Sequence, residues 1–273
     1  MTPAEWAASD DPEAMSLFLR DRLSDRKWRL LNCACVRRIW HLLADERLRT
    51  GVATAERHAD GRVDARTYGA AVTDANRARS RRRADWAAYH AARYLPGKVS
   101  WDTPSILSDC RTAMSHLPVW EVPDHGAMVV RYHTAGSIEL HTDATGPQHA
   151  TSGPSELIDM EPRSIPLPAF VASERKVANE LLGASERLAQ AAVLRDVAGD
   201  PFRSTSTEAA WLTADVVAVA RQVYDSAAFH RVRDVGAALV AANCDDAALL
   251  AHCFAATEHV RGCWAIDRLL GLT

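Results

Sequence analysis

The residues best suited to chemistry gather near the C-terminal end of the chain. They are Cys244, His252, Cys253, His259, Cys263 and Asp267. Thiolates, imidazoles and carboxylates are ligands of zinc and of iron. If residues 258–270 form one helix, His259, Cys263 and Asp267 follow one another every four positions, on a stripe that drifts by about 40° per step. The sequence is therefore compatible with a zinc or iron site, in which Cys244, His252 or the Cys33/Cys35 pair would complete a tetrahedral set.

Two other interpretations of these cysteines stay open. The spacing contains no Cys-x-x-Cys pair. Free cysteine packs in protein cores as a small hydrophobic residue, so the set is also compatible with ordinary core packing. Thiol catalysis is the third interpretation.

Cys33 and Cys35 fall within a predicted helix. Residues two apart on a helix point about 200° away from each other, so both thiols cannot bind one ion without distortion. Cys35 belongs to the apolar stripe of this helix, whereas Cys33 lies off it and is the better candidate for reactivity. A nearby Arg37 would favour its thiolate; the alternative is two packed cysteines.

Asp267 has a second interpretation, as half of a buried ion pair. It stands in an apolar context with Trp264, Ile266 and Leu269. Arg37 or Arg38 is the expected partner. Such a pair would lock the two ends of the chain together.

The middle of the chain contributes histidines. His133 and His141 flank a predicted turn, with His125, His149 and Asp143 nearby. Such a group could bind a metal ion. Solvent-exposed loop histidines are the alternative interpretation.

A run of arginines suggests a phosphate-binding surface. Arg79, Arg81, Arg82 and Arg83 precede Trp86 and Tyr89, on which nucleic-acid bases could stack. The chain nevertheless has a net charge of −3 and carries no nucleic-acid-binding motif. A solvated helix face, or docking to an acidic part of the same chain, is the alternative interpretation.

The composition is that of a folded soluble protein. Of the 273 residues, 48% are hydrophobic and 25% charged, which excludes global disorder. No apolar run is long enough for a membrane span, and residues 1–6 do not begin a signal peptide, so we expect a cytoplasmic protein. Residues 1–95 hold 18 Lys/Arg against 13 Asp/Glu, whereas residues 96–172 hold 4 against 9.

Helical patterns dominate both ends of the chain. Start signals and apolar spacing predict helices over residues 25–44, 48–59, 64–94, 173–197 and 231–242, with further helices capped by Thr213, Asp245 and Thr257. Nine of the twelve prolines lie between Pro96 and Pro168, which argues against long helices there. Residues 128–133 and 137–141 predict a β-hairpin with a glycine turn.

Several motifs together carry a family resemblance. They are MTPAEW at residues 1–6, CACVRRIW at 33–40, DPFR at 200–203, ARQVYD at 220–225 and HVRGCWAIDRLLG at 259–271. With these motifs the chain resembles a group of uncharacterised bacterial proteins of the "repeat-companion" type, over roughly residues 1–95 and 180–273. The resemblance implies a helical fold and a bacterial setting, and it supplies no catalytic residues.

We therefore expect an all-α bundle with a Pro-rich insertion that contains one β-hairpin. Residues 1–95 and 173–273 would pack together as one domain, and residues 96–172 would form the insertion. The predicted function is an interaction or regulatory module whose partner is another protein. A metal-binding protein or metal-dependent enzyme is the first alternative, and a nucleic-acid-binding accessory protein the second. The sequence contains no phosphate-binding loop, G-x-S-x-G or H-E-x-x-H, and does not decide whether the protein is an enzyme.

Overall fold

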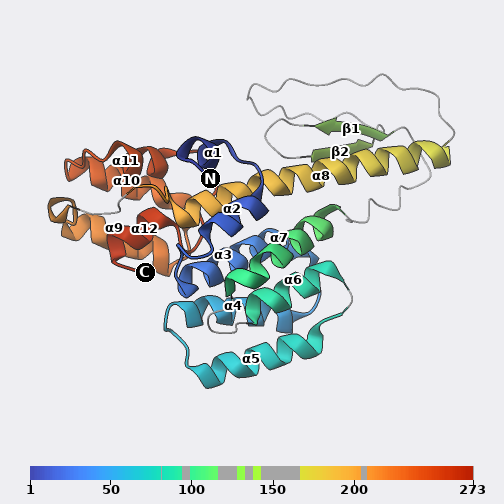
Figure 1. Cartoon of the computed structure of the whole chain (residues 1–273), viewed down its shortest axis with the longest axis horizontal. Helices are drawn as coiled ribbons and strands as arrows, with labels where there is room; N and C mark the ends of the chain where they lie inside the picture. The colour runs from blue at the N-terminus through green and yellow to red at the C-terminus, as the bar shows by residue number, and fades with distance from the viewer. Residues whose placement is uncertain are drawn as a thin grey trace. The chain divides into compact units, whose positions relative to one another are not determined.

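The computed structural model is predominantly helical, as the sequence predicts (Figure 1). The residues that it describes are 1–80, 82–93, 99–115, 128–132, 138–142, 167–203 and 208–272. The chain divides into two compact units. Unit 1 consists of residues 1–110 and 187–273, and unit 2 of residues 111–186.

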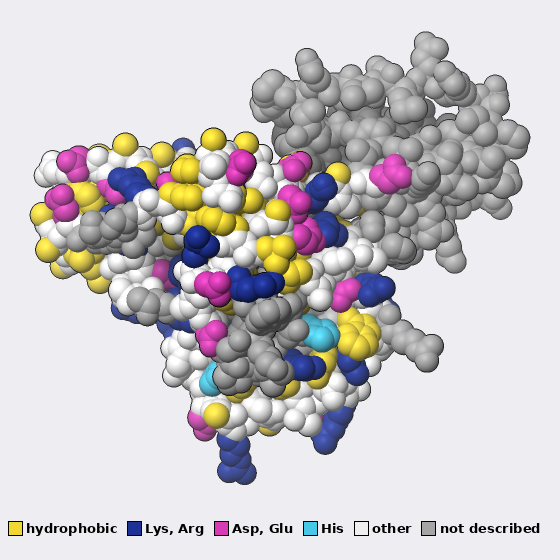
Figure 2. Space-filling view, in the orientation of Figure 1, with side chains coloured by type: hydrophobic (Ala, Val, Ile, Leu, Met, Phe, Trp, Pro, Cys, Tyr) yellow, Lys and Arg dark blue, Asp and Glu magenta, His cyan; other side chains and the backbone are white. Residues whose placement is uncertain are grey.

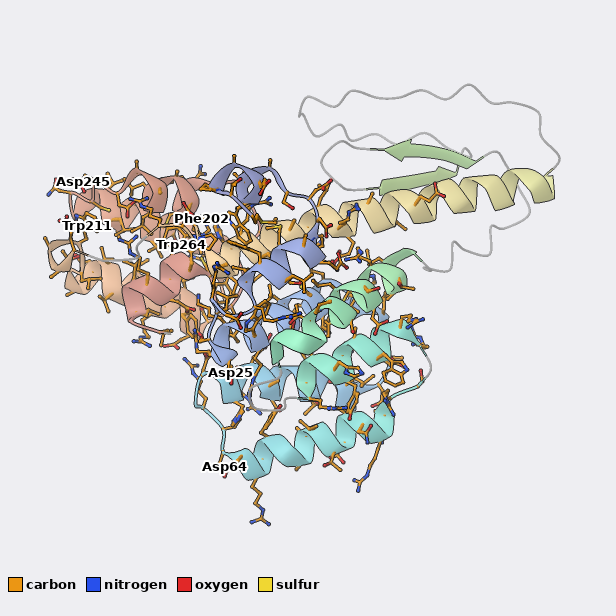
Figure 3. The ribbon with its side chains drawn as sticks, viewed as in Figure 1. Asp25, Asp64, Phe202, Trp211, Asp245 and Trp264 are labelled. Carbon is orange, nitrogen blue, oxygen red and sulfur yellow. The ribbon has the colours of Figure 1, made fainter. Side chains whose placement is uncertain are left out.

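Residues 1–93 of unit 1 contain six helices and one 3₁₀ turn in their described part. They are α1 (Pro3–Ala8), α2 (Pro12–Leu19), α3 (Asp25–Arg38), η1 (Trp40–Leu42), α4 (Glu46–Ala59), α5 (Ala65–Ala78) and α6 (Arg83–Ala92). Helices α3, α4, α5 and α6 pack against one another. Asp25 lies in the first turn of α3, and Asp64 caps α5 (Figure 3).

The C-terminal stretch forms a second group of packed helices. It contains the end of α8 (Leu167–Ala198), η2 (Ala209–Trp211), α9 (Ala214–Asp225), η3 (Phe229–Arg231), α10 (Val232–Ala241), α11 (Ala247–Phe254) and α12 (Trp264–Leu270). Helix α9 packs on α10 and α12, and α11 packs on α10 and α12. The boundaries between the two units fall within α7 (Val99–Ser115) and α8.

Side chains cap the starts of several helices, among them the expected cap Thr213 of α9. The Thr2 hydroxyl accepts from Glu5 N–H, and the Glu5 carboxylate accepts from Thr2 N–H, which is a complete capping box. Asp11, Ser24 and Thr213 also cap their helices with side-chain oxygens. These caps satisfy backbone donors that the first turn of a helix leaves unpaired.

The single helix expected over residues 64–94 is wrong, because the chain breaks between α5 and α6. Arg79 has an extended backbone, at φ −62° and ψ 120°. Ser80 Oγ then accepts from Arg82 N–H and donates to the Asp85 carboxylate. A serine that bonds nearby backbone and side chains in this way offers an alternative to continuing the helix.

The absence of long helices from the Pro-rich middle is also wrong, because α7 spans 17 residues with Pro104 inside it. Proline removes one helical hydrogen bond. Ile106, Leu107 and Cys110 on the same helix are fully buried. Their burial outweighs the lost bond, since tertiary packing supplies most helix stability in proteins.

Two short strands belong to unit 2. β1 (Met128–Tyr132) pairs antiparallel with β2 (Ile138–Thr142), and Val130 lies opposite Leu140. Residues 133–137, where a glycine turn is expected, lie outside the described residues.

The N-terminal helices approach one another closely through small residues. A Cβ atom added at Gly51 of α4 would lie 2.9 Å from the Ala75 Cβ atom of α5 and 3.2 Å from the Ala92 Cβ atom of α6.

Cys35 is fully buried, as its place on the apolar stripe predicts. Cys33 is equally buried, so the expectation of a reactive Cys33 is wrong. Burial raises the pKa of its thiol well above the usual value and outweighs the nearby Arg29 and Arg37.

A buried ionic network joins the N-terminal and C-terminal helices of unit 1. Arg26 of α3 bonds Asp267 of α12 at 2.7 Å and Asp60 at 3.1 Å. Its guanidinium also donates to the Tyr224 hydroxyl. Arg261 bonds the other oxygen of Asp60 at 2.8 Å. The four charged side chains are each less than 20% exposed, and Tyr224 is 1% exposed.

Among the helices that the structure describes, none combines the length and the apolar character needed to cross a lipid bilayer.

Candidate metal centre

Four side chains of unit 1 bring their polar atoms to one point. They are Asp196 near the end of α8, His252 on α11, His259 in the loop before α12, and Cys263 at the N-cap of α12. One ligand atom from each lies within 4.8 Å of all the others. Cys263 is fully buried, and the Asp196 side chain is 3% exposed.

The end of α8 explains how Asp196 meets Cys263. Gly199 terminates α8 with φ +68°, a left-handed conformation that glycine adopts without strain. Trp264 packs directly on it, since a Cβ atom added at Gly199 would lie 2.9 Å from the Trp264 ring. Trp264 follows Cys263 in sequence, so this contact holds the start of α12 against the end of α8. Trp264 also lies against the His252 ring, with centroids 4.8 Å apart.

Hydrogen bonds between side chains and the backbone hold the loop that carries His259. Val260 N–H donates to Asp196 Oδ2 at 2.9 Å. Lys27 donates to the carbonyls of Val197 and Gly262, at 3.1 and 2.6 Å. The loop therefore contacts α8 on one side and α3 on the other.

The distances are close to those of a tetrahedral metal site. His259 Nδ1 lies 2.6 Å from Asp196 Oδ1, and His252 Nε2 lies 3.2 Å from the same oxygen. Cys263 Sγ lies 3.2 Å from His252 Nε2 and 3.9 Å from His259 Nδ1. Ligand atoms around a tetrahedral zinc ion lie roughly 3.3–3.6 Å apart, given the bond lengths of zinc. Small side-chain shifts are therefore sufficient to accommodate an ion.

The same arrangement argues against a Cys-His-Asp catalytic relay. In a relay, one imidazole nitrogen faces the nucleophile and the other faces the carboxylate. Here Nε2 of His252 faces both Cys263 and Asp196, and Nδ1 of His259 does the same. Four donor atoms that converge on one point suit a cation at that point.

Burial and the neighbouring groups shift the pKa values of two members of the set. Burial raises the pKa of the Asp196 carboxyl, but hydrogen bonds from His252 and His259 outweigh burial and hold it below its usual value. Burial raises the pKa of the Cys263 thiol well above its usual value, and Asp196 adds to that rise. The N–H groups of Ile266 and Ala265 act in the opposite direction. A bound metal ion would deprotonate such a thiol outright.

Asp267 was expected among the ligands, and the structure contradicts this. The expected helix over residues 258–270 does not form, because Gly262 has φ +94° and α12 begins only at Trp264. Thr257 is therefore not its cap. Asp267 instead lies 2.7 Å from Lys27 and 2.7 Å from Arg26.

The expected pairing of Asp267 with Arg37 or Arg38 is likewise wrong. These two arginines stand at the opposite end of α3 from Arg26 and Lys27. Arg37 pairs with Glu56, and Arg38 pairs with Glu258.

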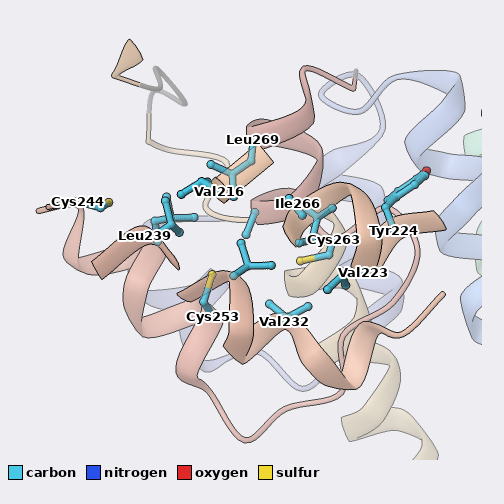
Figure 4. Close-up of a cluster of buried hydrophobic side chains, with 14 of the residues drawn as sticks. Val216, Val223, Tyr224, Val232, Leu239, Cys244, Cys253, Cys263, Ile266 and Leu269 are labelled. Carbon is cyan, nitrogen blue, oxygen red and sulfur yellow. The ribbon is translucent and has the colours of Figure 1, made fainter. Parts of the chain in front are cut away.

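Cys244 and Cys253 were expected as ligands, and neither belongs to the four-residue group. Both lie in the hydrophobic core of the C-terminal helices, and Cys244 lies away from Cys263 in that core (Figure 4). Burial raises the pKa of Cys253 to about 12. A Cβ atom added at Gly236 would lie 2.9 Å from the Cys253 Cβ atom, which indicates tight packing. For these two cysteines the packing interpretation holds.

The structure does not support a binding site at the other candidate residues that it describes. His133 and Arg81 lie outside the described residues, as does the side chain of His141. Arg82 donates to the Leu42 carbonyl, and Arg83 pairs with Asp109 at 3.0 Å. The Arg79 guanidinium stacks 4.0 Å from the centre of the Trp86 ring. The described arginines of the run thus contact their own chain.

Sequence reasoning identified three of the four side chains and missed Asp196. That residue precedes His259 by 63 positions and lies on α8, whereas His259 lies in the loop before α12. Its neighbours Arg195 and Val197 give no motif. No local signal links it to the C-terminal cluster.

The comparisons with known proteins add no assignment. No family model, no curated protein and no solved structure matches the chain.

Proposed function

We propose that this protein binds one zinc ion through Asp196, His252, His259 and Cys263, and that the ion is structural. The observation that carries the proposal is the convergence of one atom from each of these side chains within 4.8 Å. Four protein ligands complete a tetrahedral zinc shell and leave no open position, which is the usual arrangement of structural sites. The ion would tie the end of α8 to α11 and α12.

Zinc is favoured over iron for two reasons. Two histidines and one carboxylate also occur in non-haem iron enzymes, but those sites keep open positions for substrate and oxygen. Here Cys263 supplies a fourth ligand and is fully buried. Thiolate and imidazole in a closed tetrahedral set suit zinc.

Elemental analysis of protein purified without chelator tests the proposal. We expect about one equivalent of zinc per chain. Cys263→Ala and His252→Ala should each lose it, whereas the matched control Cys253→Ala should keep it. Cobalt-substituted protein should show a thiolate-to-metal charge-transfer band that disappears in Cys263→Ala. Less than a tenth of an equivalent of any transition metal in the unmodified protein would refute the site.

We also propose, as a second function, a helical interaction module that binds another protein. The supporting observation is an exposed apolar patch formed by Leu17, Phe18 and Phe202. Leu17 is 53% exposed and Phe202 42%. The rings of Phe18 and Phe202 stack with centroids 5.3 Å apart. Figure 2 shows hydrophobic side chains gathered on this face of the molecule, and Figure 3 labels Phe202.

Contiguous exposed apolar surface often marks a protein-binding site. Partners that co-purify with the unmodified protein should be lost from Leu17→Asp and Phe202→Asp. Val240→Asp is the matched control, because Val240 is equally exposed and lies outside the patch. Retention of every partner by the two patch variants would exclude this surface.

The remaining expectations rest on the sequence. We propose a bacterial, cytoplasmic protein of the "repeat-companion" type, with a Pro-rich insertion that contains a hairpin. Six free cysteines support a reducing compartment.

A further inference from the structure

A hollow lies beside the proposed zinc site, within unit 1. Its volume is about 520 Å³, within the range of pockets for small ligands. Its wall includes the apolar side chains of Phe229, Cys253 and Phe254. The loop of residues 255–259 completes it, so His259 lines the hollow while it also faces Asp196.

The hollow contains one arginine that no described carboxylate neutralises. Arg233 and His230 line it and are exposed. Within the described ranges, neither pairs with a carboxylate. Glu258 is the one acidic residue of the lining, and it pairs with Arg38 of α3. The hollow is therefore complementary to an anionic ligand with an apolar body.

The Nε2 atom of His259 lacks a hydrogen-bond partner among the described residues. Its Nδ1 atom is 2.6 Å from Asp196, so its Nε2 atom is directed away from the zinc ligands. Nε2 is buried and has no hydrogen-bond partner among the described residues. The side chain is only 5% exposed. A histidine that ligates a metal almost always donates its other N–H to a carboxylate, a carbonyl or a water molecule.

We infer that this hollow binds a small organic carboxylate whose apolar body contacts Phe229 and Phe254. Arg233 holds the carboxylate. Because Nε2 of His259 is buried in the unliganded protein, the ring must shift toward the hollow before one carboxylate oxygen can accept its hydrogen bond. The link to His259 rests on the proposed zinc site, because an imidazole that ligates zinc through Nδ1 carries its proton on Nε2. The bound carboxylate thereby supplies the hydrogen-bond acceptor that His259, as a zinc ligand, lacks.

This arrangement couples the two binding events. An acceptor on Nε2–H makes the imidazole a stronger ligand, and removal of such partners typically costs 10–100-fold in metal affinity. Coupling between two binding equilibria is reciprocal. The carboxylate should therefore bind about tenfold more tightly to the zinc-loaded protein than to the metal-free protein.

Calorimetric titration with phenylacetate tests the inference. Phenylacetamide, of the same size and shape without the charge, is the control ligand. Titrations use zinc-loaded and metal-free protein, and the variants Arg233→Gln and Arg221→Gln. Arg221 is an exposed arginine of α9 outside the hollow, which makes it the matched control.

We expect phenylacetate to bind at least tenfold more tightly than phenylacetamide. Arg233→Gln should abolish this preference, and Arg221→Gln should retain it. Equal binding of acid and amide, no binding of either, or a preference that survives in Arg233→Gln would overturn the carboxylate site.

The comparison of zinc-loaded with metal-free protein separates this inference from the zinc proposal. If the protein takes up no zinc, the zinc site fails, and the titrations of metal-free protein still decide the carboxylate site. If zinc binds but leaves the phenylacetate affinity unchanged, the contact with His259 is overturned and the zinc site stands.

Discussion

His259 Nδ1 and Asp196 Oδ1 lie 2.6 Å apart although 63 positions separate them in the chain. The contact joins a loop between two short helices to the end of α8. Because Val260 N–H occupies the other oxygen of Asp196, this carboxylate fixes both the ring and the backbone of the loop. The geometry of the candidate metal centre thus depends on one aspartate.

Chelation should selectively expose one thiol. All six cysteines are buried, so in the native protein none should react with a disulfide reagent within minutes. Removal of zinc should speed the modification of Cys263, because its loop then loses the tie to α8 and α11. Peptide mapping by mass spectrometry measures the rates. Cys253 is the internal control, and equal acceleration at both positions would indicate general unfolding instead of a local site.

Replacement of Asp267 by Asn should strongly destabilise unit 1. Asp267 is 2% exposed and neutralises Arg26 and Lys27. Removal of one partner from a buried ionic network typically costs about 3–5 kcal/mol, since it leaves buried charge uncompensated. We expect the melting temperature to fall by roughly 6–20 °C.

Asp234→Asn provides the control for this variant. Asp234 forms an exposed pair with Arg231 at 2.8 Å. Exposed pairs contribute about 0–1 kcal/mol, so this melting temperature should hardly change. Equal melting temperatures of the two variants would contradict a stabilising role of the network.

Gly199→Ala should destabilise the protein more than Gly271→Ala. Both glycines have a left-handed backbone, with φ +68° and +64°, so alanine is strained at both positions. Only at Gly199 would the new Cβ atom collide with Trp264, at 2.9 Å, because at Gly271 no atom lies within 4 Å. We expect about 1 kcal/mol for Gly271→Ala and about 2–4 kcal/mol for Gly199→Ala, measured by urea unfolding. Equal losses of unfolding free energy in the two variants would mean that the Trp264 ring moves aside without cost.

The stability that Asp246 confers should depend on pH. Burial raises the pKa of its carboxyl, but hydrogen bonds from Arg268 and from Leu249 N–H outweigh burial, so the pKa lies below its usual value. A carboxyl whose pKa is lowered in the folded state stabilises the protein fully at pH values above its pKa in the unfolded state, which is about 3.9. This contribution is lost as the pH falls through the folded pKa.

The free energies of unfolding of unmodified protein and Asp246→Asn should therefore differ at pH 5–7 and converge below about pH 4. The adjacent Asp245→Asn is the control, because Asp245 is exposed (Figure 3) and Asp246 caps α11. A difference that persists unchanged at pH 3 would show that the charge of Asp246 contributes no stability.

Local signals in the sequence were sufficient for most helices. Caps such as Thr213, and the apolar stripe that includes Cys35, depend on neighbours within a few positions. The break at Ser80 was missed because it depends on a contact with Asp85 that periodicity does not reveal. Burial of Ile106 likewise explains why Pro104 lies inside a helix, and burial is not visible in the sequence.

The candidate site was predicted in part for the same reason. His252, His259 and Cys263 are close in the sequence, so their types alone drew attention to them. Asp196 enters through tertiary packing of α8. Asp267 was misassigned because a continuous helix was assumed across Gly262, although a glycine at that position was itself a signal of a break.

The buried network also bears on the order in which the protein assembles during synthesis. The partners that Lys27 contacts, namely Val197, Gly262 and Asp267, are made at least 170 residues after it. At about 5–20 residues per second, α3 leaves the ribosome roughly 10–50 s before α12 does. Throughout that interval Lys27 lacks Gly262 and Asp267 as partners and stays hydrated, so α3 cannot reach its final packing early. A nascent chain stalled before residue 260 should therefore remain sensitive to protease around α3, and one extended past residue 270 should become resistant.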